Sequence, residues 1–343
     1  MERFKVLVAV RHPAVKVLER ALGKRFEVVK KPVGPEELGE EMRQGYDAVV
    51  VGHWLPVTRR AIESAHPKLR AVATLSVGFD HIDLAAGERG IKILNAATDS
   101  LCASSYSVAE FAWALLLALV RKVGWSTQAA LHDRPRWEEI HPLMEENPSL
   151  WGREFFNRTL CVIGVGRIGS HVCRIGRGFG MRVIGYDPYV NREKAMECGA
   201  ELLDNYFQVL SEADFISINA CLTDETKNMV DSRAVGAMKE GVYIVNTARG
   251  AIVDERAILE GLRKGKIAGY AADVLWGEPP TERSSPLLAA YRGGQPNLLI
   301  SPHVAWCTER AIERYGLIVA NKLREVLEGL KFAHPADYLK IHP

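Results

Sequence analysis

The feature that most constrains this chain is a glycine-rich segment between two short apolar runs. Residues 159–163 read as a strand, and Gly164-Val165-Gly166-Arg167-Ile168-Gly169 follows directly. A helical stretch and a second apolar run then lead to Asp187, 18 residues after Gly169. Strand, Gly-x-Gly-x-x-Gly loop, helix, strand and acid, in this order, form the fingerprint of a dinucleotide-binding βαβ unit. An ordinary βαβ turn would not need the acid.

Each position of the fingerprint has a physical role. Gly164 allows a tight turn, Gly166 lets backbone N–H groups approach a pyrophosphate, and Gly169 lets the helix pack closely on the strand. A carboxylate at Asp187 can accept hydrogen bonds from the adenosine ribose and would repel a 2′-phosphate. Because the next arginine along the chain is Arg192, the pattern favours NAD over NADP.

Length and composition indicate a globular protein of two domains. A chain of 343 residues exceeds the usual size of one domain, and 48% apolar with 25% charged residues supplies an ample core. The net charge of +2 gives no sign of a nucleic-acid partner. The six cysteines (102, 161, 173, 198, 221 and 307) lack metal-ligand spacing, so we expect reduced thiols, Cys161 and Cys198 in core-like surroundings, and no metal site.

Targeting and membrane signals are weak. Residues 1–10 are too short and too charged for a signal peptide and resemble a first strand. The longest apolar run, Phe111 to Val120, has about half the length that a membrane span needs. We therefore expect a soluble, cytoplasmic protein without a membrane partner.

Two series of short apolar runs alternate with helical patterns. The first series has strands at 5–10, 26–29, 48–51, 71–75 and 91–94, with helices such as 36–45 and 58–64. The second begins at the fingerprint and continues with 215–218, 242–245, 270–274 and 298–300. Strands alternating with helices predict parallel sheets covered on both faces, so the fold class is α/β in both halves.

Between the two series, Ser107 and Glu110 predict a capping box that begins a helix running to about Val123. This helix is apolar nearly all round, which favours burial between domains or subunits. Residues 132–148 are rich in Pro, Glu and His, and we expect an irregular arm or loop there. A last amphipathic helix is expected over 308–330.

Three ionisable residues follow separate strands of the second series. They are Arg249, Glu278 and His303. Because the carboxyl ends of parallel strands meet at one edge of a sheet, the three side chains could converge on a bound nicotinamide. Taken singly, each also has a structural explanation, as a surface ion pair, a solvated loop acid and a capped turn histidine respectively.

Four further motifs stand in order along the chain. They are Ser76-Val77-Gly78-Phe79-Asp80-His81-Ile82-Asp83, Asn-Thr-Ala-Arg-Gly-Ala-Ile-Val-Asp-Glu at 246–255, Ala-Ala-Asp-Val at 271–274 with Glu278-Pro279-Pro280, and Pro-His-Val-Ala-Trp at 302–306. With the fingerprint, they resemble the D-isomer-specific 2-hydroxyacid dehydrogenases, whose substrate loop the first motif matches. The resemblance extends roughly from residue 50 to residue 310.

The resemblance implies two Rossmann-like, doubly wound parallel-sheet domains. A NAD-binding domain, 104–307, would be inserted into a flavodoxin-like substrate domain made of 1–103 and 308–343. It also implies NAD (NADH) as cofactor, a small 2-oxo or 2-hydroxy acid as substrate, and a homodimer. The helix after Ser107 and the following arm would lie in the subunit contact.

The resemblance also implies how the reaction proceeds. Arg249 would bind the substrate carboxylate with its planar, permanently charged fork, and the backbone N–H groups of Val77 and Gly78 would hold the other carboxylate oxygen. His303, as imidazolium, would donate a proton to the carbonyl oxygen as hydride arrives from the nicotinamide. Glu278 would hydrogen-bond the far ring nitrogen and stabilise the imidazolium.

Further contacts follow from the same resemblance. The substrate-binding positions would be Ser76, Val77, Gly78, Arg249 and Trp306. The cofactor-binding positions would be Ser107, Gly164, Gly166, Arg167, Ile168, Gly169, Asp187, Ala220, Thr247, Ala248, Asp273, His303 and Ala305, with Arg167 and Ile168 at the pyrophosphate. One departure stands out: Asn219-Ala220-Cys221 replaces the family's usual His-x-Pro, which puts side-chain roles in that loop in doubt.

The loop Gly52-His53-Trp54-Leu55-Pro56 bears on the substrate, because it offers no Arg or Lys to a phosphate. Glyoxylate or hydroxypyruvate therefore fits better, and D-3-phosphoglycerate is the alternative. Tyr186-Asp187-Pro188-Tyr189 and His-x-Ala-Trp at 303–306 also resemble corepressors that use NAD(H) as a dimerisation ligand, so a protein-binding scaffold is a second alternative. A formate or phosphite enzyme is a weaker one, since phosphite enzymes carry Lys at the place of Val77.

Overall fold

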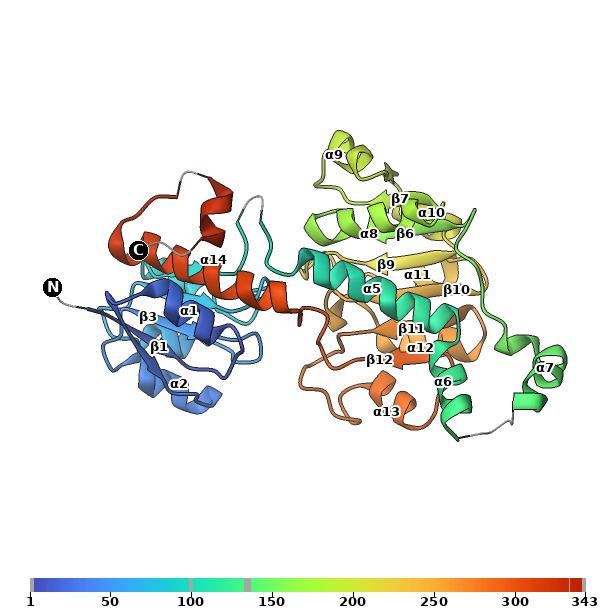
Figure 1. The fold of residues 1–343 in the computed structure, drawn as a ribbon, viewed down its shortest axis with the longest axis horizontal. Coiled ribbons are helices and arrows are strands. Elements are labelled where there is room, and N and C mark those ends of the chain that lie inside the picture. The colour runs from blue at the N-terminus through green and yellow to red at the C-terminus, as the bar shows by residue number, and fades with distance from the viewer. Residues whose placement is uncertain (1–2, 99–100, 133–136, 333, 341–343) are drawn as a thin grey trace. The chain divides into compact units, whose positions relative to one another are not determined.

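Two compact units make up this protein. The computed structural model describes residues 3–98, 101–132, 137–332 and 334–340. One unit consists of residues 1–104 and 307–343, and the other of residues 105–306, so the second is inserted into the first. Each unit is a parallel sheet with helices around it (Figure 1). The predicted fold class, a doubly wound domain inserted into another, is confirmed.

The first unit has a five-stranded sheet in the order β2-β1-β3-β4-β5, the arrangement of flavodoxin-like folds. All pairs are parallel. Its elements are β1 (Phe4–Val8), α1 (Val15–Leu22), β2 (Phe26–Lys30), α2 (Pro35–Met42), β3 (Ala48–Val51), α3 (Arg59–Glu63), β4 (Ala71–Thr74), α4 (Ala85–Glu88), β5 (Lys92–Leu94), α14 (Glu309–Glu328) and the 3-10 turn η3 (Pro335–Leu339).

The second unit has a seven-stranded parallel sheet in the order β12-β11-β10-β9-β6-β7-β8. The chain runs outward from β6 to β8, returns to β9 on the other side, and so creates the switch point where doubly wound folds bind ligands. Its strands are β6 (Thr159–Ile163), β7 (Arg182–Tyr186), β8 (Glu201–Leu202), β9 (Phe215–Ile218), β10 (Val242–Asn246), β11 (Ile267–Ala272) and β12 (Leu298–Ile300). Its helical elements are α5 (Ser105–Val120), α6 (Val123–His132), α7 (Trp137–Glu146), η1 (Pro148–Leu150), α8 (Arg167–Gly178), α9 (Arg192–Glu197), α10 (Tyr206–Glu212), α11 (Ser232–Ala237), η2 (Gly250–Ile252), α12 (Glu255–Arg263) and α13 (Pro286–Arg292).

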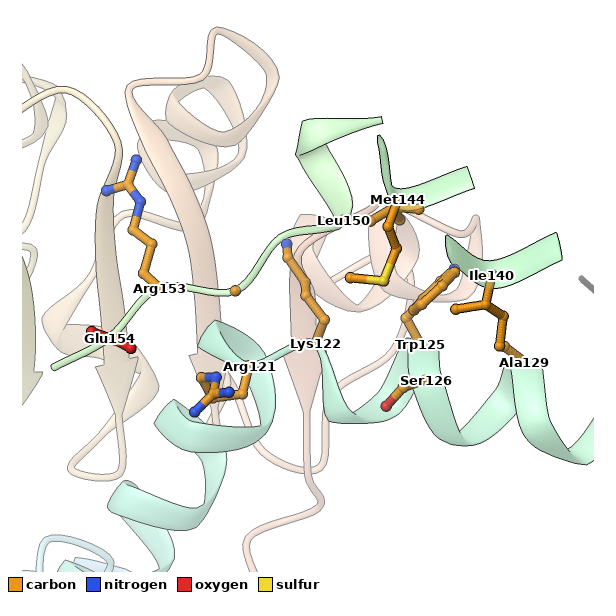
Figure 2. A pocket seen from close by; sticks show the side chains of 11 residues that line it. Arg121, Lys122, Trp125, Ser126, Ala129, Ile140, Met144, Leu150, Arg153 and Glu154 are labelled. Carbon is orange, nitrogen blue, oxygen red and sulfur yellow. The ribbon is translucent and has the colours of Figure 1, made fainter. Parts of the chain in front are cut away.

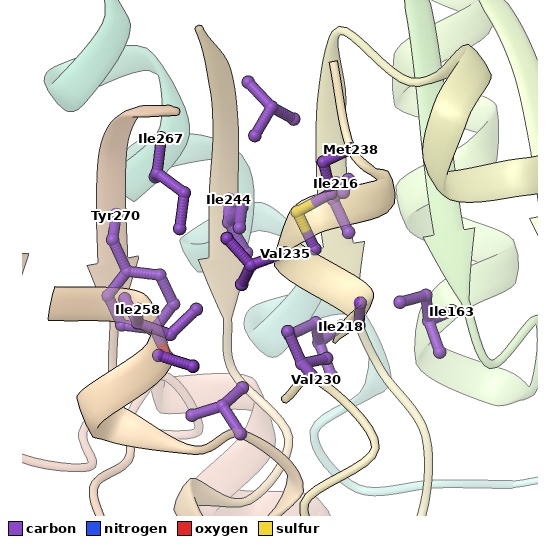
Figure 3. Close-up of a cluster of buried hydrophobic side chains, with 14 of the residues drawn as sticks. Ile163, Ile216, Ile218, Val230, Val235, Met238, Ile244, Ile258, Ile267 and Tyr270 are labelled. Atoms are coloured by element: carbon purple, nitrogen blue, oxygen red, sulfur yellow. The ribbon is translucent and has the colours of Figure 1, made fainter. Parts of the chain in front are cut away.

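The two faces of this sheet pack into separate apolar clusters. Along β10, Val242 and Ile244 belong to one cluster, whereas Tyr243 and Val245 belong to the other. Figure 3 shows the first cluster, in which Ile244 lies among side chains from the neighbouring strands and from α11 and α12. Because successive strand residues point to opposite faces, burial on both faces requires the continuous apolar runs that the sequence shows.

Helix α5 differs from its prediction at both ends. It begins at Ser105, so Ser107 lies inside the first turn and the expected capping box is not the helix start. The Ser107 hydroxyl instead donates to the Trp306 carbonyl at 3.4 Å. The helix ends at Val120, because Lys122 adopts a left-handed backbone with φ of 58°. One face of α5 packs on α8, β10 and β11.

Of the segment 132–148, expected to be an irregular arm, residues 133–136 lie outside the described residues and most of the rest is helical. Helix α7 spans Trp137–Glu146 with Pro142 inside it. Pro142 lacks the N–H for one helical hydrogen bond, yet the flanking Glu, Leu and Met residues favour helix, and two acids in the first turn stabilise its N-terminus. The proline content therefore predicted the wrong conformation. Among the described residues, no helix is both long and apolar enough to cross a membrane.

The packing of α1 on α14 yields a stability prediction. A Cβ at Gly316 would lie 2.6 Å from the Val17 Cβ and 2.9 Å from the Ala14 carbonyl oxygen. We expect Gly316→Ala to lower the free energy of unfolding by about 1–3 kcal/mol through overpacking, measured by urea denaturation. In the control Gly87→Ala, the added methyl meets nothing within 4 Å, and stability should be unchanged or slightly higher. Equal effects of the two substitutions would contradict the packing argument.

Candidate active site

The three fingerprint glycines have the geometry expected of a dinucleotide loop. Gly164 has φ of 87°, and a Cβ there would lie 2.6 Å from the Ala220 nitrogen. A Cβ at Gly169 would lie 2.0 Å from the Gly164 carbonyl oxygen, so the helix and the loop are in direct contact. Gly166 is the N-cap of α8 without a side-chain cap, and a Cβ there would meet nothing within 4 Å. The loop is thus tightly packed at Gly164 and Gly169 and open at Gly166, the helix N-terminus, where a pyrophosphate could bind.

Asp187 is held at the end of β7 by three backbone donors. One carboxylate oxygen accepts from the Val165 N–H at 2.9 Å, and the other accepts from Tyr189 and Val190 at 3.0 and 3.2 Å. The acid is therefore tied directly to the glycine loop. The Arg192 guanidinium donates to the Leu202 carbonyl at 2.7 Å and to Asp204. These contacts occupy the guanidinium, which disfavours its use as a partner for a 2′-phosphate.

Two buried polar atoms at the same edge of the sheet lack a hydrogen-bond partner in the described part of the chain. They are the Asn219 Oδ1 and the Thr247 Oγ1. Asn219 follows β9, its N–H donates to the Ile163 carbonyl at 2.7 Å, and its amide donates to the Ser217 hydroxyl at 2.9 Å. Such orphaned atoms fit a polar group supplied by a nucleotide, since buried polar atoms are normally paired. Thr247 is among the predicted cofactor contacts, and Asn219 lies in the loop that departs from the family's usual His-x-Pro.

Arg249 emerges from a loop that Asn246 braces from below. Asn246 is fully buried at the end of β10. Its Oδ1 accepts from the Ala248 N–H and its Nδ2 donates to the Arg249 carbonyl, both at 3.0 Å. The Arg249 guanidinium donates to the Ala248 carbonyl at 2.8 Å. The sequence pattern assigned no role to Asn246, although it begins the motif.

His303 and Glu278 lie in contact, as the resemblance implied. The His303 Nδ1 and the Glu278 Oε2 are 2.5 Å apart, and the other Glu278 oxygen accepts from the Leu275 N–H at 3.0 Å. His303 has a left-handed backbone with φ of 54°, and its N–H donates to the Asp273 carbonyl at 2.8 Å. An uncommon backbone conformation at a histidine paired with a carboxylate is typical of a functional position.

The Asp273 carboxylate supports the loop that carries His303, while its predicted contact with the cofactor stays a prediction. Its side chain is 1% exposed and accepts from the Ser301 hydroxyl at 2.6 Å and from the Val304 and Ala305 N–H groups at 3.0 and 2.9 Å. Because its oxygens are directed to these donors, the carboxylate holds the loop that carries His303. The Trp306 indole N–H donates back to the His303 carbonyl at 3.0 Å within the same loop.

The predicted substrate loop belongs to the first unit. The Ser76 hydroxyl donates to the Gly78 carbonyl at 2.6 Å and lies 2.7 Å from the Thr74 hydroxyl. The Asn95 amide donates to the Val77 carbonyl at 2.7 Å. Ser76 and Asn95 thereby brace the turn at the carboxyl end of β4. The role of this loop in substrate binding stays a prediction.

A cavity of about 330 Å³ lies in the second unit, and its lining includes Trp125, Ile140 and Met144 (Figure 2). Its lining includes Lys122, which donates to the Asn297 side chain before β12, and Arg153, which donates to the Gly241 carbonyl before β10. These strand starts mark the amino edge of the sheet, opposite the edge that carries His303. The cavity is therefore separate from the candidate active site. No group of three or more potential metal ligands occurs among the described residues.

The fold and the site define a dinucleotide-binding protein with a histidine–carboxylate pair. The family model for the NAD binding domain of D-isomer specific 2-hydroxyacid dehydrogenases matches residues 113–305. The chain belongs to this family, and NAD is its cofactor. The predicted family and cofactor are confirmed.

Individual relatives agree with this assignment. D-3-phosphoglycerate dehydrogenase of Methanocaldococcus jannaschii is 37% identical over 95% of this chain and 58% of its own length, and that of Archaeoglobus fulgidus is 33% identical over 92% and 56%. This chain thus spans little more than half the length of these relatives. Among solved structures, D-lactate dehydrogenase of Aquifex aeolicus with NAD and lactic acid has a TM-score of 0.77 at 28% identity, covering 95% and 96% of the two chains. A glyoxylate reductase from Paecilomyes thermophila has 0.80 at 26%, covering 97% and 98%.

The contact between Glu278 and His303 yields a prediction for catalysis. In Glu278→Gln the side chain keeps its size but loses its negative charge, so its hydrogen bond to the His303 ring is weaker. We expect kcat/KM for 2-oxo acid reduction to fall about tenfold or more, because the ring is less well held for proton transfer. The measurement is kcat/KM with NADH for the variant and the wild-type chain. An unchanged kcat/KM would contradict the pairing.

Proposed function

We propose that this protein is a NAD(H)-dependent oxidoreductase that interconverts D-2-hydroxy acids and 2-oxo acids. The observation that carries the proposal is the His303–Glu278 contact of 2.5 Å at the same sheet edge as the glycine fingerprint. A histidine paired with a carboxylate beside a nicotinamide can exchange the proton that accompanies hydride transfer. The scaffold alternative requires no such chemistry, and activity measurements distinguish the two.

The roles of the side chains follow from their contacts. NAD, when bound, accepts or supplies the hydride. Because Nδ1 of His303 faces Glu278, we assign to Nε2 the proton given to the substrate carbonyl in reduction and removed from the hydroxyl in oxidation. Arg249, braced by Asn246, is the permanent cation that binds the substrate carboxylate. We propose, from the sequence alone, that the loop Ser76–Gly78 also binds the substrate carboxylate.

The substrate side chain is the finer part of the proposal. The curated relatives favour D-3-phosphoglycerate, the second candidate, over glyoxylate or hydroxypyruvate. The loop after β3 argues the other way, because the Trp54 ring lies 3.1 Å from a Cβ built on Gly52 and stacks on His12 with centroids 6.1 Å apart. Burial lowers the pKa of His12 to about 4, so this imidazole is neutral near pH 7.

A neutral aromatic surface suits an uncharged substrate side chain better than a phosphate, which binds most strongly to cationic donors. We therefore retain small 2-oxo acids such as glyoxylate and hydroxypyruvate as the first substrates to test. Phosphohydroxypyruvate, the 2-oxo partner of D-3-phosphoglycerate, is the direct competitor.

The activity test uses the purified chain with NADH and each of these three 2-oxo acids. We expect turnover of glyoxylate or hydroxypyruvate, and His303→Ala should reduce it about 10²–10⁴-fold while NADH still binds, as followed by NADH fluorescence. The matched control is His66→Ala, an exposed histidine of the first unit, which should leave the rate unchanged.

The outcomes separate the candidates. A preference for phosphohydroxypyruvate over both other acids would replace the first substrate assignment by the second. NADH binding without turnover of any 2-oxo acid, in a wider panel that includes branched and aromatic acids, would contradict the enzyme proposal and favour a scaffold. Near-normal activity of His303→Ala would remove that residue from the mechanism.

We also propose a homodimer in which residues near α5 and α6 form the contact. Support comes from large apolar side chains left exposed in the second unit, namely Val123, Leu131, Trp151 and Phe156. Exposed apolar groups of this kind are typical of association surfaces. Sedimentation should give twice the 38.0 kDa of one chain, and Leu131→Asp should shift it toward monomer. Leu84→Asp, equally exposed in the first unit, is the control; a monomeric wild-type chain would contradict the proposal.

A further inference from the structure

The segment that carries Glu278 is anchored by a second, buried carboxylate. Glu255 is the first residue of α12 and is 5% exposed. Its Oε1 accepts from the Trp276 N–H at 2.9 Å, and its Oε2 accepts from the Ser285 hydroxyl at 2.7 Å and the Leu287 N–H at 3.2 Å. One side chain therefore ties down both ends of the stretch from Trp276 to Leu287, and Glu278 lies between them.

The Arg249 loop packs on the same segment. A Cβ at Gly250 would lie 2.0 Å from the Leu275 carbonyl carbon and 2.4 Å from the Trp276 nitrogen. Gly250 therefore touches the residue whose N–H donates to Glu255, and its neighbour Leu275 donates to Glu278 at 3.0 Å. A displacement of this backbone would therefore move both Arg249 and Glu278.

Burial of a carboxylate is costly unless its oxygens are hydrogen bonded. Three donors hydrogen-bond the Glu255 carboxylate, and the side chain of one of them, Ser285, is itself held in place. Ser285 is fully buried and also caps α13, its hydroxyl accepting from the Leu288 N–H at 3.1 Å. An anchor of this kind can hold a loop to a fraction of an ångström, which the placement of an acid–base pair requires.

We propose that Glu255 is a positioning residue for the reaction, acting through Glu278 on His303. The proposal rests on the proposed function, because it concerns the proton exchange assigned to His303. Loss of the Glu255 acceptor frees the Trp276–Leu287 stretch, moves the Glu278 carboxylate off the His303 ring and leaves the imidazolium less stabilised. In the described part of the chain, Glu255 has no hydrogen bond to the glycine fingerprint or to Asp187, so we expect NADH binding to be independent of it.

The experiment replaces Glu255 by Gln, which keeps its size but turns one acceptor into a donor facing a backbone N–H. We expect kcat for reduction to fall about ten- to hundredfold with little change in KM, as a positioning role requires. The NADH dissociation constant, from fluorescence, should change less than about twofold. The control is Glu260→Gln on the same helix, whose exposed carboxylate pairs with Lys264 at 2.6 Å and should be silent.

A double variant separates positioning from general destabilisation. If Glu255 acts through Glu278, adding Glu255→Gln to Glu278→Gln should cost little further rate, since the contact is already lost. Ser285→Ala, which removes one of the three donors, should lower kcat in the same way but more weakly. Multiplicative losses in the double variant, or an unchanged kcat in both single Glu255 and Ser285 variants, would overturn the proposal. Absence of wild-type turnover would instead contradict the proposed function.

Discussion

The parallel register of the seven-stranded sheet is the constraint on which the candidate site depends. Because β6, β10, β11 and β12 run in the same direction, the loops that follow them emerge at one edge. The register is fixed by burial on both faces: a slip of one residue in β10 would exchange Ile244 with Tyr243 between two differently shaped apolar clusters. The core therefore decides where the glycine loop, Arg249 and His303 can meet, although of these only Val165 in the glycine loop belongs to the core.

Loops at a sheet edge need support of another kind, since they are open to solvent and cannot be held by apolar packing alone. Here the support consists of buried polar side chains placed just beneath the loops. Asn246 braces the Arg249 loop, Asp273 the His303 loop, and Glu255 the segment of Glu278. Ordering each loop residue costs about 1–2 kcal/mol of backbone entropy, so the anchors must be multiply hydrogen bonded to be effective. Each of them is, and each bonds to backbone groups, with a serine hydroxyl in addition at Asp273 and at Glu255.

These anchors also mark the limit of what could be predicted from the sequence. Strands such as 48–51, 215–218 and 298–300 were predicted to the residue, since continuous apolar runs are local signals, and the glycine roles followed from backbone geometry. The role of Asp273 did not, because its partners lie 28 to 32 positions further along the chain. Local patterns misled at Ser107, which lies inside α5, and at Pro142, which lies inside α7. The site residues could be predicted from sequence motifs, whereas the buried side chains that support them could be identified only from the fold.

The difference between residues that maintain the fold and residues that meet the substrate also bears on substrate preference. Identity of 37% with a D-3-phosphoglycerate dehydrogenase is compatible with a shared fold and a different substrate, because the fold depends on many buried residues. A substrate side chain meets few residues, so a preference for one substrate can change at little cost to the fold. In this chain the loop after β3 presents Trp54, packed over Gly52 and stacked on a neutral His12. Family membership and substrate are therefore carried by different parts of the molecule, and the loop after β3 is where a preference against phosphate would arise.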